Sequence, residues 1–398
     1  MATNKNYLTG KEIRAIAKEN AKIMKRLEAY KYRDAEESEF LTEMRDDSNI
    51  LEIDGLHTYF FTEQGTVKAV NGVSYDVPKN AVVGVVGESG CGKSVTSMSV
   101  MRLIQGPTGQ IVDGSIRFKA YDYKRDAHGQ PIPGENGFQM EEKVYDIAKM
   151  PIHEIHRIRG KQIAMIFQEP MTSLNPVFTI GEQLDEVTLI HVPGATKELA
   201  KAKSEEMLRL VGIIPENVYN AFPHELSGGM RQRVMIAMAL AAEPRLIIAD
   251  EPTTALDVTI QAQILDLLQD IKTKIDGSIL LITHDLGVIA EMADYVVVMY
   301  AGKVIEKGTV EEIFHDPRHP YTIGLQKSKP TMTLDDDVEL YNIPGNVPNP
   351  VNMPSHCYFK DRCAKCTAKC SGDYPGMIRV SPTHFVACHL YSEEVSNG

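Results

Sequence analysis

Short apolar runs, each followed by a polar or glycine-rich segment, recur through the middle of the chain. Four of them have the length and composition of buried strands: residues 81–86, 163–167, 246–249 and 279–282. Between the second and the third run, residues 180–242 have a largely helical pattern. This mixture of buried strands and helices predicts an α/β domain with a helical part inserted in it.

Alternating positions predict further strands on either side of the first run. Leu51, Ile53 and Gly55 begin one strand, residues 67–77 form a second, and residues 114–120 form a third. Residues 121–150 are polar and contain glycine and proline, so we expect a surface insertion there, to which we assign no function.

The first 48 residues are expected to form a helical extension. Thr9 and Glu12 have capping-box spacing and precede an amphipathic pattern, whose apolar positions are Ile13, Ile16, Ala17, Met24, Leu27 and Tyr30. Up to residue 33 the segment holds nine Lys/Arg against three Asp/Glu, whereas residues 34–48 hold seven acids against one Arg. We expect the basic helix to rest on a partner subunit or an anionic membrane surface; the alternative is a solvated arm.

Length and charge limit the class of protein. A chain of 398 residues exceeds one ordinary domain. Charged residues make up 24% of it, and no apolar run approaches the ~18 residues of a membrane span, so we expect a cytosolic protein without a secretory signal. The net charge of −12 argues against a general nucleic-acid binder. We expect an extension (1–48), a nucleotide-binding domain (49–310, helical subdomain about 180–243) and a C-terminal domain (311–398).

Cysteines are concentrated near the end of the chain. Five of the six follow Pro354: Cys357, Cys363, Cys366, Cys370 and Cys388. In a reducing compartment such clustering favours metal ligation over a disulfide framework, with buried structural cysteines as the alternative. All-thiolate ligation allows tetrahedral Zn²⁺ or an iron–sulfur cluster, and the spacing does not choose between them.

A phosphate-binding loop follows the first buried run. Its eight residues match the pattern Gly, any four residues, Gly-Lys-Ser: Gly87, Glu88, Ser89, Gly90, Cys91, Gly92, Lys93 and Ser94. The strand before it and the helix expected over 93–103 give the context that the motif needs. Backbone N–H groups and the helix N-terminus then bind phosphate, Lys93 reaches the β- and γ-phosphates, and Ser94 holds Mg²⁺.

Polar side chains with catalytic potential follow the other buried runs. Gln168 ends the second run and can approach Mg²⁺ and the attacking water. Asp250 and Glu251 close the third, where Asp250 suits Mg²⁺ and Glu251 suits polarising water. His284 follows the fourth. Ser227, Gly228 and Gly229 place a second anion-binding sequence at the start of a helix.

Together these motifs resemble the nucleotide-binding subunit of an ABC transporter. Six elements occur in that family's order: the phosphate loop 87–94, the Q-loop Gln168, the signature 226–230, the Walker B strand 246–250, the D-loop 255–257 and the switch His284. Met230 stands where many members have Gln. The resemblance implies a P-loop ABC ATPase domain with a RecA-like core and a helical subdomain.

The resemblance also implies roles for individual residues. Glu251 would be the catalytic carboxylate, His284 the γ-phosphate sensor and Asp257 part of the D-loop. Phe60 would stack on adenine, with Tyr59 or Phe61 as alternates.

A narrower resemblance, to the oligopeptide/dipeptide/nickel import ATPases, rests on residues 88–90, 168–176 and 319–322 and on the cysteine-bearing C-terminus. It implies a peripheral ATPase at the cytoplasmic face of the membrane that powers peptide uptake. The implied partners are a homologous second ATPase, two transmembrane permeases and an extracytoplasmic binding protein. Nickel import, or a soluble ABC ATPase acting on nucleic acid or ribosomes, is the alternative function.

Some members of this family carry four cysteines around a [4Fe–4S] cluster. The matching residues here are Cys357, Cys363, Cys370 and Cys388, with Cys366 as an alternate ligand and Zn²⁺ as the alternative metal.

Overall fold

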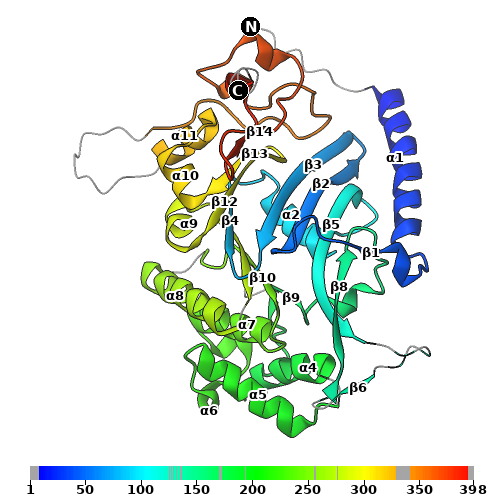
Figure 1. Ribbon diagram of the computed structural model, residues 1–398, viewed down its shortest axis with the longest axis vertical. Helices are drawn as coiled ribbons and strands as arrows, with labels where there is room; N and C mark the ends of the chain where they lie inside the picture. The colour runs from blue at the N-terminus through cyan, green and yellow to red at the C-terminus, as the bar shows by residue number, and fades with distance from the viewer. Residues whose placement is uncertain are drawn as a thin grey trace.

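The described part of the protein has two large β-sheets, a small two-stranded ribbon, a helical lobe and an extended C-terminal segment (Figure 1). The computed structural model describes residues 9–124, 126, 128, 130, 132–134, 137–169, 173–192, 194–254, 257–275, 277–328 and 341–392.

The larger sheet holds the four apolar runs at its centre. In spatial order its strands are β14 (Ile378–Arg379), β15 (Phe385–Val386), β13 (Lys303–Thr309), β12 (Tyr295–Tyr300), β4 (Val82–Val86), β11 (Ser278–Ile282), β10 (Leu246–Asp250) and β9 (Ile163–Ile166). The strands from β12 to β9 are parallel, which explains their continuous apolar sequences, because a parallel sheet is covered on both faces. The carboxyl ends of these parallel strands carry the candidate chemistry.

The second sheet is antiparallel. Its strands, in order, are β1 (Leu41–Thr42), β8 (Met140–Asp146), β5 (Gly109–Tyr123), β2 (Asn49–Thr62) and β3 (Gly65–Pro78), and a small ribbon pairs β6 (Pro133–Gly134) with β7 (Gly137–Phe138). The predicted surface insertion at 121–150 is therefore wrong at both ends, since β5 and β8 pair from Arg117–Asp146 to Tyr123–Met140. Its polar composition reflects one solvent-facing side of an antiparallel pair.

Helices cover the larger sheet and form the separate lobe (Figure 1). The helix α2 (Lys93–Val100) leaves the phosphate loop, and its end packs in the core shared by the two sheets. The lobe contains α4 (Ile180–His191), α5 (Lys197–Leu210), α6 (Pro215–Val218) and α7 (Gly228–Leu240), which confirms the predicted helical stretch. The other α-helices of the described residues are α1 (Gly10–Lys31), α8 (Val258–Ile275), α9 (Leu286–Met292), α10 (Val310–His315) and α11 (Pro320–Lys327).

The amphipathic N-terminal helix is present as α1 (Gly10–Lys31), and its capping box forms between Thr9 and Glu12. The helix lies along the antiparallel sheet of its own chain (Figure 1). Asn20 Nδ2 donates to Thr62 O at 2.8 Å, and the N–H of Ile152 donates to Lys31 O at 2.9 Å. One face of α1 is thus occupied by the chain itself, and its contact with a partner or a membrane stays a prediction.

Residues 341–392 form a mostly irregular segment beside the edge of the larger sheet. β15 extends that sheet by pairing with β13, and Tyr358 and Phe359 join its apolar core. The domain boundaries expected from sequence stay predictions. Within the described ranges, no helix combines the length and apolar character needed to cross a membrane.

Candidate functional site

The phosphate loop is shaped by backbone conformations that side chains rarely adopt. Gly87 has φ +153° and Gly92 has φ +103°. A Cβ at Gly87 would lie 2.2 Å from Met299 O, and one at Gly92 would lie 2.4 Å from Ala69 O. Glycine is therefore required at both positions by conformation and by space. The loop closes directly onto α2, whose N-terminus supplies unpaired N–H groups.

A cavity of about 410 Å³ opens over this loop. Its lining brings together eight residues that were predicted from sequence: Ser89, Gly90, Gly92, Lys93, Ser94, Gln168, Glu251 and His284. Ala69 and Val95 complete the lining and were not predicted. Residues from four separate stretches of sequence thus converge on one cavity, because each stretch follows a strand that ends at the same edge of the sheet.

Three groups at the base of the cavity suit a nucleotide phosphate and a divalent cation. Lys93 Nζ donates to Gly87 O at 2.7 Å, and Ser94 Oγ donates to Asp250 Oδ1 at 3.0 Å. Burial raises the pKa of Asp250 to about 6, and the charge of Glu251 adds to this effect. A cation bound by Ser94 and Asp250 would offset the cost of burying the ionised Asp250 carboxylate. Oxygen donors of this kind are the ligands that Mg²⁺ prefers.

Glu251 is held in a fixed orientation at the mouth of the cavity. Its backbone is left-handed, with φ +47°, which costs about 1–2 kcal/mol for a residue with a side chain. Gln168 Nε2 donates to Glu251 Oε2 at 2.8 Å, Thr254 Oγ1 donates to the same oxygen at 2.9 Å, and His284 Nδ1 lies 3.4 Å from Oε1. Strain of this kind at a carboxylate held from three sides is typical of a functional position.

The signature residues lie elsewhere. Ser227 caps α7 and its Oγ accepts the N–H of Met230 at 3.3 Å, while a Cβ at Gly229 would meet Ile260 of α8. The cavity lining does not include the signature residues Ser227, Gly228 and Gly229. It also does not include Asp257, which is exposed. Ala255 and Leu256, the other D-loop residues, lie outside the described residues.

The three candidate adenine-stacking rings differ in their surroundings. Phe61 is 5% exposed, and the Phe60 ring lies next to Gly109. The Tyr59 hydroxyl donates to Asn71 Oδ1 at 2.9 Å, and Lys68 Nζ is 5.8 Å from the ring centroid. None of the three lines the cavity over the phosphate loop, so adenine stacking by Phe60 or its alternates stays a prediction.

Two residues of the phosphate loop face away from the cavity. Cys91 is buried in the core between the sheets, and burial raises the pKa of its thiol. The Glu88 carboxylate accepts two hydrogen bonds from Arg362, at 2.8 and 3.0 Å, and the N–H of Glu88 donates to the Tyr321 hydroxyl at 2.8 Å. The C-terminal segment therefore buttresses the phosphate loop directly. The sequence analysis missed this contact, because 274 residues separate Glu88 from Arg362.

Replacing Arg362 with alanine should weaken both folding and ATP binding. Arg362 is 8% exposed, and removal of its guanidinium leaves the Glu88 carboxylate without its bidentate partner. Such a loss costs about 3–5 kcal/mol for a buried pair and less here, because Glu88 is partly exposed. We expect a lower melting temperature and a weaker ATP affinity, measured by thermal scanning and equilibrium titration. Arg379→Ala, at an exposed arginine of the same segment that does not contact the phosphate loop, is the control for ATP affinity and should leave it unchanged. Wild-type affinity in Arg362→Ala would contradict the buttress.

His319 is a buried histidine of the same region. It is 2% exposed, and its Nδ1 accepts the N–H of Tyr321 at 3.0 Å at the start of α11. Burial lowers the pKa of His319 to about 4, with Glu306 opposing the shift.

This histidine should make stability fall in mild acid. Between its folded pKa and its ordinary value the unfolded chain binds a proton that the folded chain excludes, so stability decreases as pH falls through this window. The expected contribution is about 2 kcal/mol between about pH 7 and pH 5. Asn also caps helices but does not titrate, so urea unfolding of His319→Asn should show a smaller acid loss than wild type. Equal losses would contradict the assignment.

The five C-terminal thiols lie in one neighbourhood. The N–H of Cys357 donates to Cys370 O at 3.3 Å. Burial raises the pKa of Cys363, and the charge of Cys370 adds to this effect. Burial raises the pKa of Cys388 to about 11, whereas hydrogen bonds from Thr367 outweigh burial and lower the pKa of Cys370. Among the described residues, no three His, Cys, Asp or Glu side chains are placed to hold a metal ion. The predicted iron–sulfur or zinc site therefore stays a prediction.

Known proteins resemble this chain in sequence. It matches the ABC transporter family over residues 70–254 and the oligopeptide/dipeptide transporter C-terminal region over residues 305–370. It is 47% identical to the oligopeptide transport ATP-binding protein AppD of Bacillus subtilis (strain 168) over 87% of this chain and 98% of that protein. The dipeptide transport ATP-binding protein DppD of the same organism is 45% identical, over 87% of this chain and 96% of that protein.

Solved structures share the fold. The dimeric ATP-binding cassette MJ0796, bound to ADP and Pi, is 23% identical and matches with a TM-score of 0.53 over 65% of this chain and 98% of that chain. The fold is thus that of a P-loop ABC ATPase. From the two family matches and the near full-length relatives, the chain belongs to the ATP-binding proteins of ABC transporters of the oligopeptide/dipeptide type, which are ATPases.

Proposed function

We propose that this chain is the ATP-hydrolysing subunit of an ABC importer that takes up di- or oligopeptides. The observation that carries the proposal is the Glu251 carboxylate, held by Gln168, Thr254 and His284 at the mouth of the cavity over the phosphate loop. The peptide cargo rests on the names of the relatives, which are oligopeptide and dipeptide transport proteins. Nickel import is the second candidate, since it occurs in the resembling family. A soluble ABC ATPase is disfavoured by the oligopeptide/dipeptide transporter match.

The cavity residues divide the work of binding and hydrolysis. The N–H groups of the phosphate loop and Lys93 hold the β- and γ-phosphates. Ser94 and Gln168, with Asp250 behind them, would hold Mg²⁺, which would supply positive charge against the charge that develops on the phosphoryl oxygens. Glu251 accepts a proton from the attacking water, and His284 contacts the γ-phosphate. The proposal assigns adenine stacking to Phe60 or its alternates.

A second ATPase chain would complete the site. Ser227, Gly228 and Gly229 form an N–H-rich helix start that lies outside the cavity of their own chain, which supports a sandwich in which the signature of one chain meets the phosphate loop of the other. Asp257 would lie at the same interface. A dimer is also the arrangement of the solved cassette MJ0796. We propose a heterodimer with a homologous chain, since peptide importers commonly pair two ATPases.

The permeases would contact the region after Gln168. Val177 is 71% exposed and Phe178 is 49% exposed, with Ile190 of α4 66% exposed nearby in sequence. Exposed apolar side chains of this size mark interaction sites. We propose that this surface receives a permease helix at the cytoplasmic face of the membrane, and that an extracytoplasmic binding protein delivers the peptide.

The assembly is tested by comparing the isolated chain with the complex purified from membranes. We expect the isolated chain to hydrolyse ATP slowly, and the complex to contain a second ATPase and two permeases and to be faster when peptide-loaded binding protein is added. Full activity of the isolated chain, with no stimulation by peptide, would overturn the proposal. Stimulation by nickel instead of peptide would support the second candidate.

We further propose that Cys357, Cys363, Cys370 and Cys388 hold a [4Fe–4S] cluster, with Zn²⁺ as the alternative. Support comes from their shared neighbourhood, in which the charge at Cys370 acts on the other three thiols. The bound group would stabilise a segment that has little regular structure, because the free energy of metal binding contributes directly to the free energy of folding.

Anaerobically purified protein should therefore be brown and absorb at about 400 nm. It should also contain stoichiometric iron and sulfide. Cys363→Ser should lose the colour, whereas Cys366→Ser, which changes the alternate ligand, should keep it. Colourless protein with stoichiometric zinc would replace the cluster by Zn²⁺. Metal-free protein with an ordered C-terminal segment would contradict ligation altogether.

A further inference from the structure

A second cavity, of about 370 Å³, lies between α1 and the antiparallel sheet. Its walls come from α1, the loop after α2, the first half of β5 and the turn after β8. It shares no lining residue with the cavity over the phosphate loop. Its volume is at the lower end of the ~300–1000 Å³ typical of small-molecule sites. This space is therefore a separate candidate binding site.

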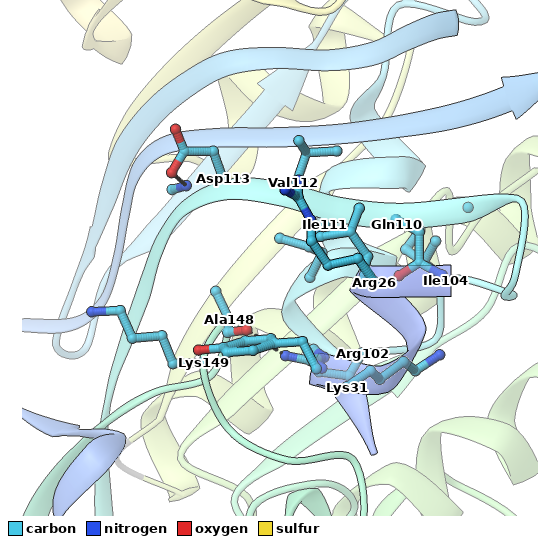
Figure 2. Close-up of a pocket in the computed structure, with 14 residues that line it drawn as sticks. Arg26, Lys31, Arg102, Ile104, Gln110, Ile111, Val112, Asp113, Ala148 and Lys149 are labelled. Carbon is cyan, nitrogen blue, oxygen red and sulfur yellow. Dashed lines mark hydrogen bonds between the residues drawn. The ribbon is translucent and has the colours of Figure 1, made fainter. Parts of the chain in front are cut away.

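The lining carries a strong excess of positive charge. Four cations, Arg26, Lys31, Arg102 and Lys149, surround the hollow, against the single carboxylate of Asp113 (Figure 2). The four come from three parts of the chain, α1, the loop after α2 and the turn after β8, that the fold brings together.

Some of this charge is already partly compensated. Lys149 Nζ lies 3.1 Å from Asp146 Oδ2, and Asp113 Oδ1 accepts the N–H of Gly114 at 2.8 Å. With Lys149 counted as paired, three lining cations remain against Asp113, and the Glu28 carboxylate lies beside the lining, where it accepts a hydrogen bond from Gln110 Nε2. The remaining excess of positive charge favours an anionic ligand.

Arg102 is held rigidly at the inner wall. Its backbone is left-handed, with φ +53°, and its Nη1 donates to Ile147 O and Ala148 O at 2.7 Å each. Burial lowers the pKa of Arg102 to about 10, with the neighbouring cations Arg159 and Arg33 adding to the effect. The Asp146 carboxylate, which also pairs with Lys149, opposes part of this shift. A half-buried arginine that is held in place among other cations is a favourable partner for an anion.

We propose that this cavity binds a small phosphate-bearing anion. A phosphate ester carries about −1.5 to −2 charge, so the lining cations would attract it more strongly than a single carboxylate. Arginine and lysine side chains from different elements suit several phosphate oxygens at once. The apolar side chains of Leu27, Ile104 and Ile111, which also line the cavity, would contact the remainder of the ligand. The phosphate belongs either to a soluble molecule or to a lipid headgroup.

The sequence offers a clean reporter for this site. It contains no tryptophan, and Tyr30, which lines the cavity, is 46% exposed. Tyr30→Trp would therefore place a single indole fluorophore in the cavity with an aromatic ring retained. The full-length variant is titrated with inorganic pyrophosphate, and separately with phosphatidylglycerol vesicles and with neutral phosphatidylcholine vesicles. A repeat with Lys93→Ala added removes the contribution of the phosphate loop.

We expect saturable fluorescence changes that persist in the Lys93→Ala background. Arg26→Gln with Lys31→Gln should weaken the response about tenfold or more, because each charged hydrogen bond contributes about 1.5–3 kcal/mol. Arg102 is left intact, since it also holds two backbone carbonyls. Lys11→Gln with Lys18→Gln makes the same charge change on α1 outside the cavity and should leave the affinity unchanged.

The arms of the experiment separate the two sources of phosphate. A response to pyrophosphate assigns a soluble ligand, and a response to the anionic vesicles alone assigns a lipid headgroup. Absence of a saturable response to either probe would overturn the proposal. Equal weakening in the two double variants would also overturn it, because it would show only general charge attraction.

Discussion

Glu251→Gln is expected to lower ATP turnover by about 100-fold to 10,000-fold, the range that a positioned general base contributes. The amide keeps the size of the side chain and its contacts with Thr254 and His284, but it cannot accept a proton from water. The phosphate loop is untouched, so nucleotide affinity should stay near that of wild type. ATP should then accumulate unhydrolysed and hold the closed dimer together.

Single-turnover hydrolysis and nucleotide titration on the same preparations separate these two effects. Glu291→Gln, an exposed glutamate of α9, makes the same charge change away from the cavity and should hydrolyse ATP at the wild-type rate. Near-normal hydrolysis by Glu251→Gln would refute the catalytic assignment. A parallel loss of ATP binding would mean that Glu251 is structural.

Lys93→Ala should weaken ATP binding itself, the step that precedes hydrolysis. The ammonium is 5% exposed and donates to Gly87 O, so it is held directly under the phosphate loop. Losing charge-assisted hydrogen bonds of about 1.5–3 kcal/mol predicts a roughly 10-fold to 100-fold lower affinity.

Equilibrium binding of a fluorescent ATP analogue measures this loss, and thermal scanning checks that the variant is folded. Lys197→Ala, at an exposed lysine of α5, is the control for the loss of one cation. Unchanged affinity in folded Lys93→Ala protein would count against phosphate binding by this loop.

The ATP site was predictable because its parts are local. The phosphate loop, Gln168, Glu251 and His284 each come at or shortly after the end of a buried strand of the same parallel sheet, so the order of apolar runs and polar residues already indicated their convergence. The helical lobe was equally predictable from the helical pattern of its sequence. These features depend on residues that lie close together in the sequence, so the sequence alone indicates them.

Contacts across long sequence separations were not predictable. The Arg362–Glu88 pair joins residues 274 positions apart, and no spacing rule connects them. The β5–β8 pair was missed because β8 has a polar sequence, with Tyr145 among its buried residues. The second cavity escaped notice because its cations are scattered over three segments and gather only in the folded chain.

Uptake of labelled peptide tests the central claim most directly. Cells lacking this chain are compared with the same cells expressing wild type or Glu251→Gln at equal levels, with labelled nickel as the parallel cargo. The account predicts that wild type restores peptide uptake and that Glu251→Gln does not. Peptide uptake that is unaffected by loss of the chain, or restored equally by Glu251→Gln, would contradict it.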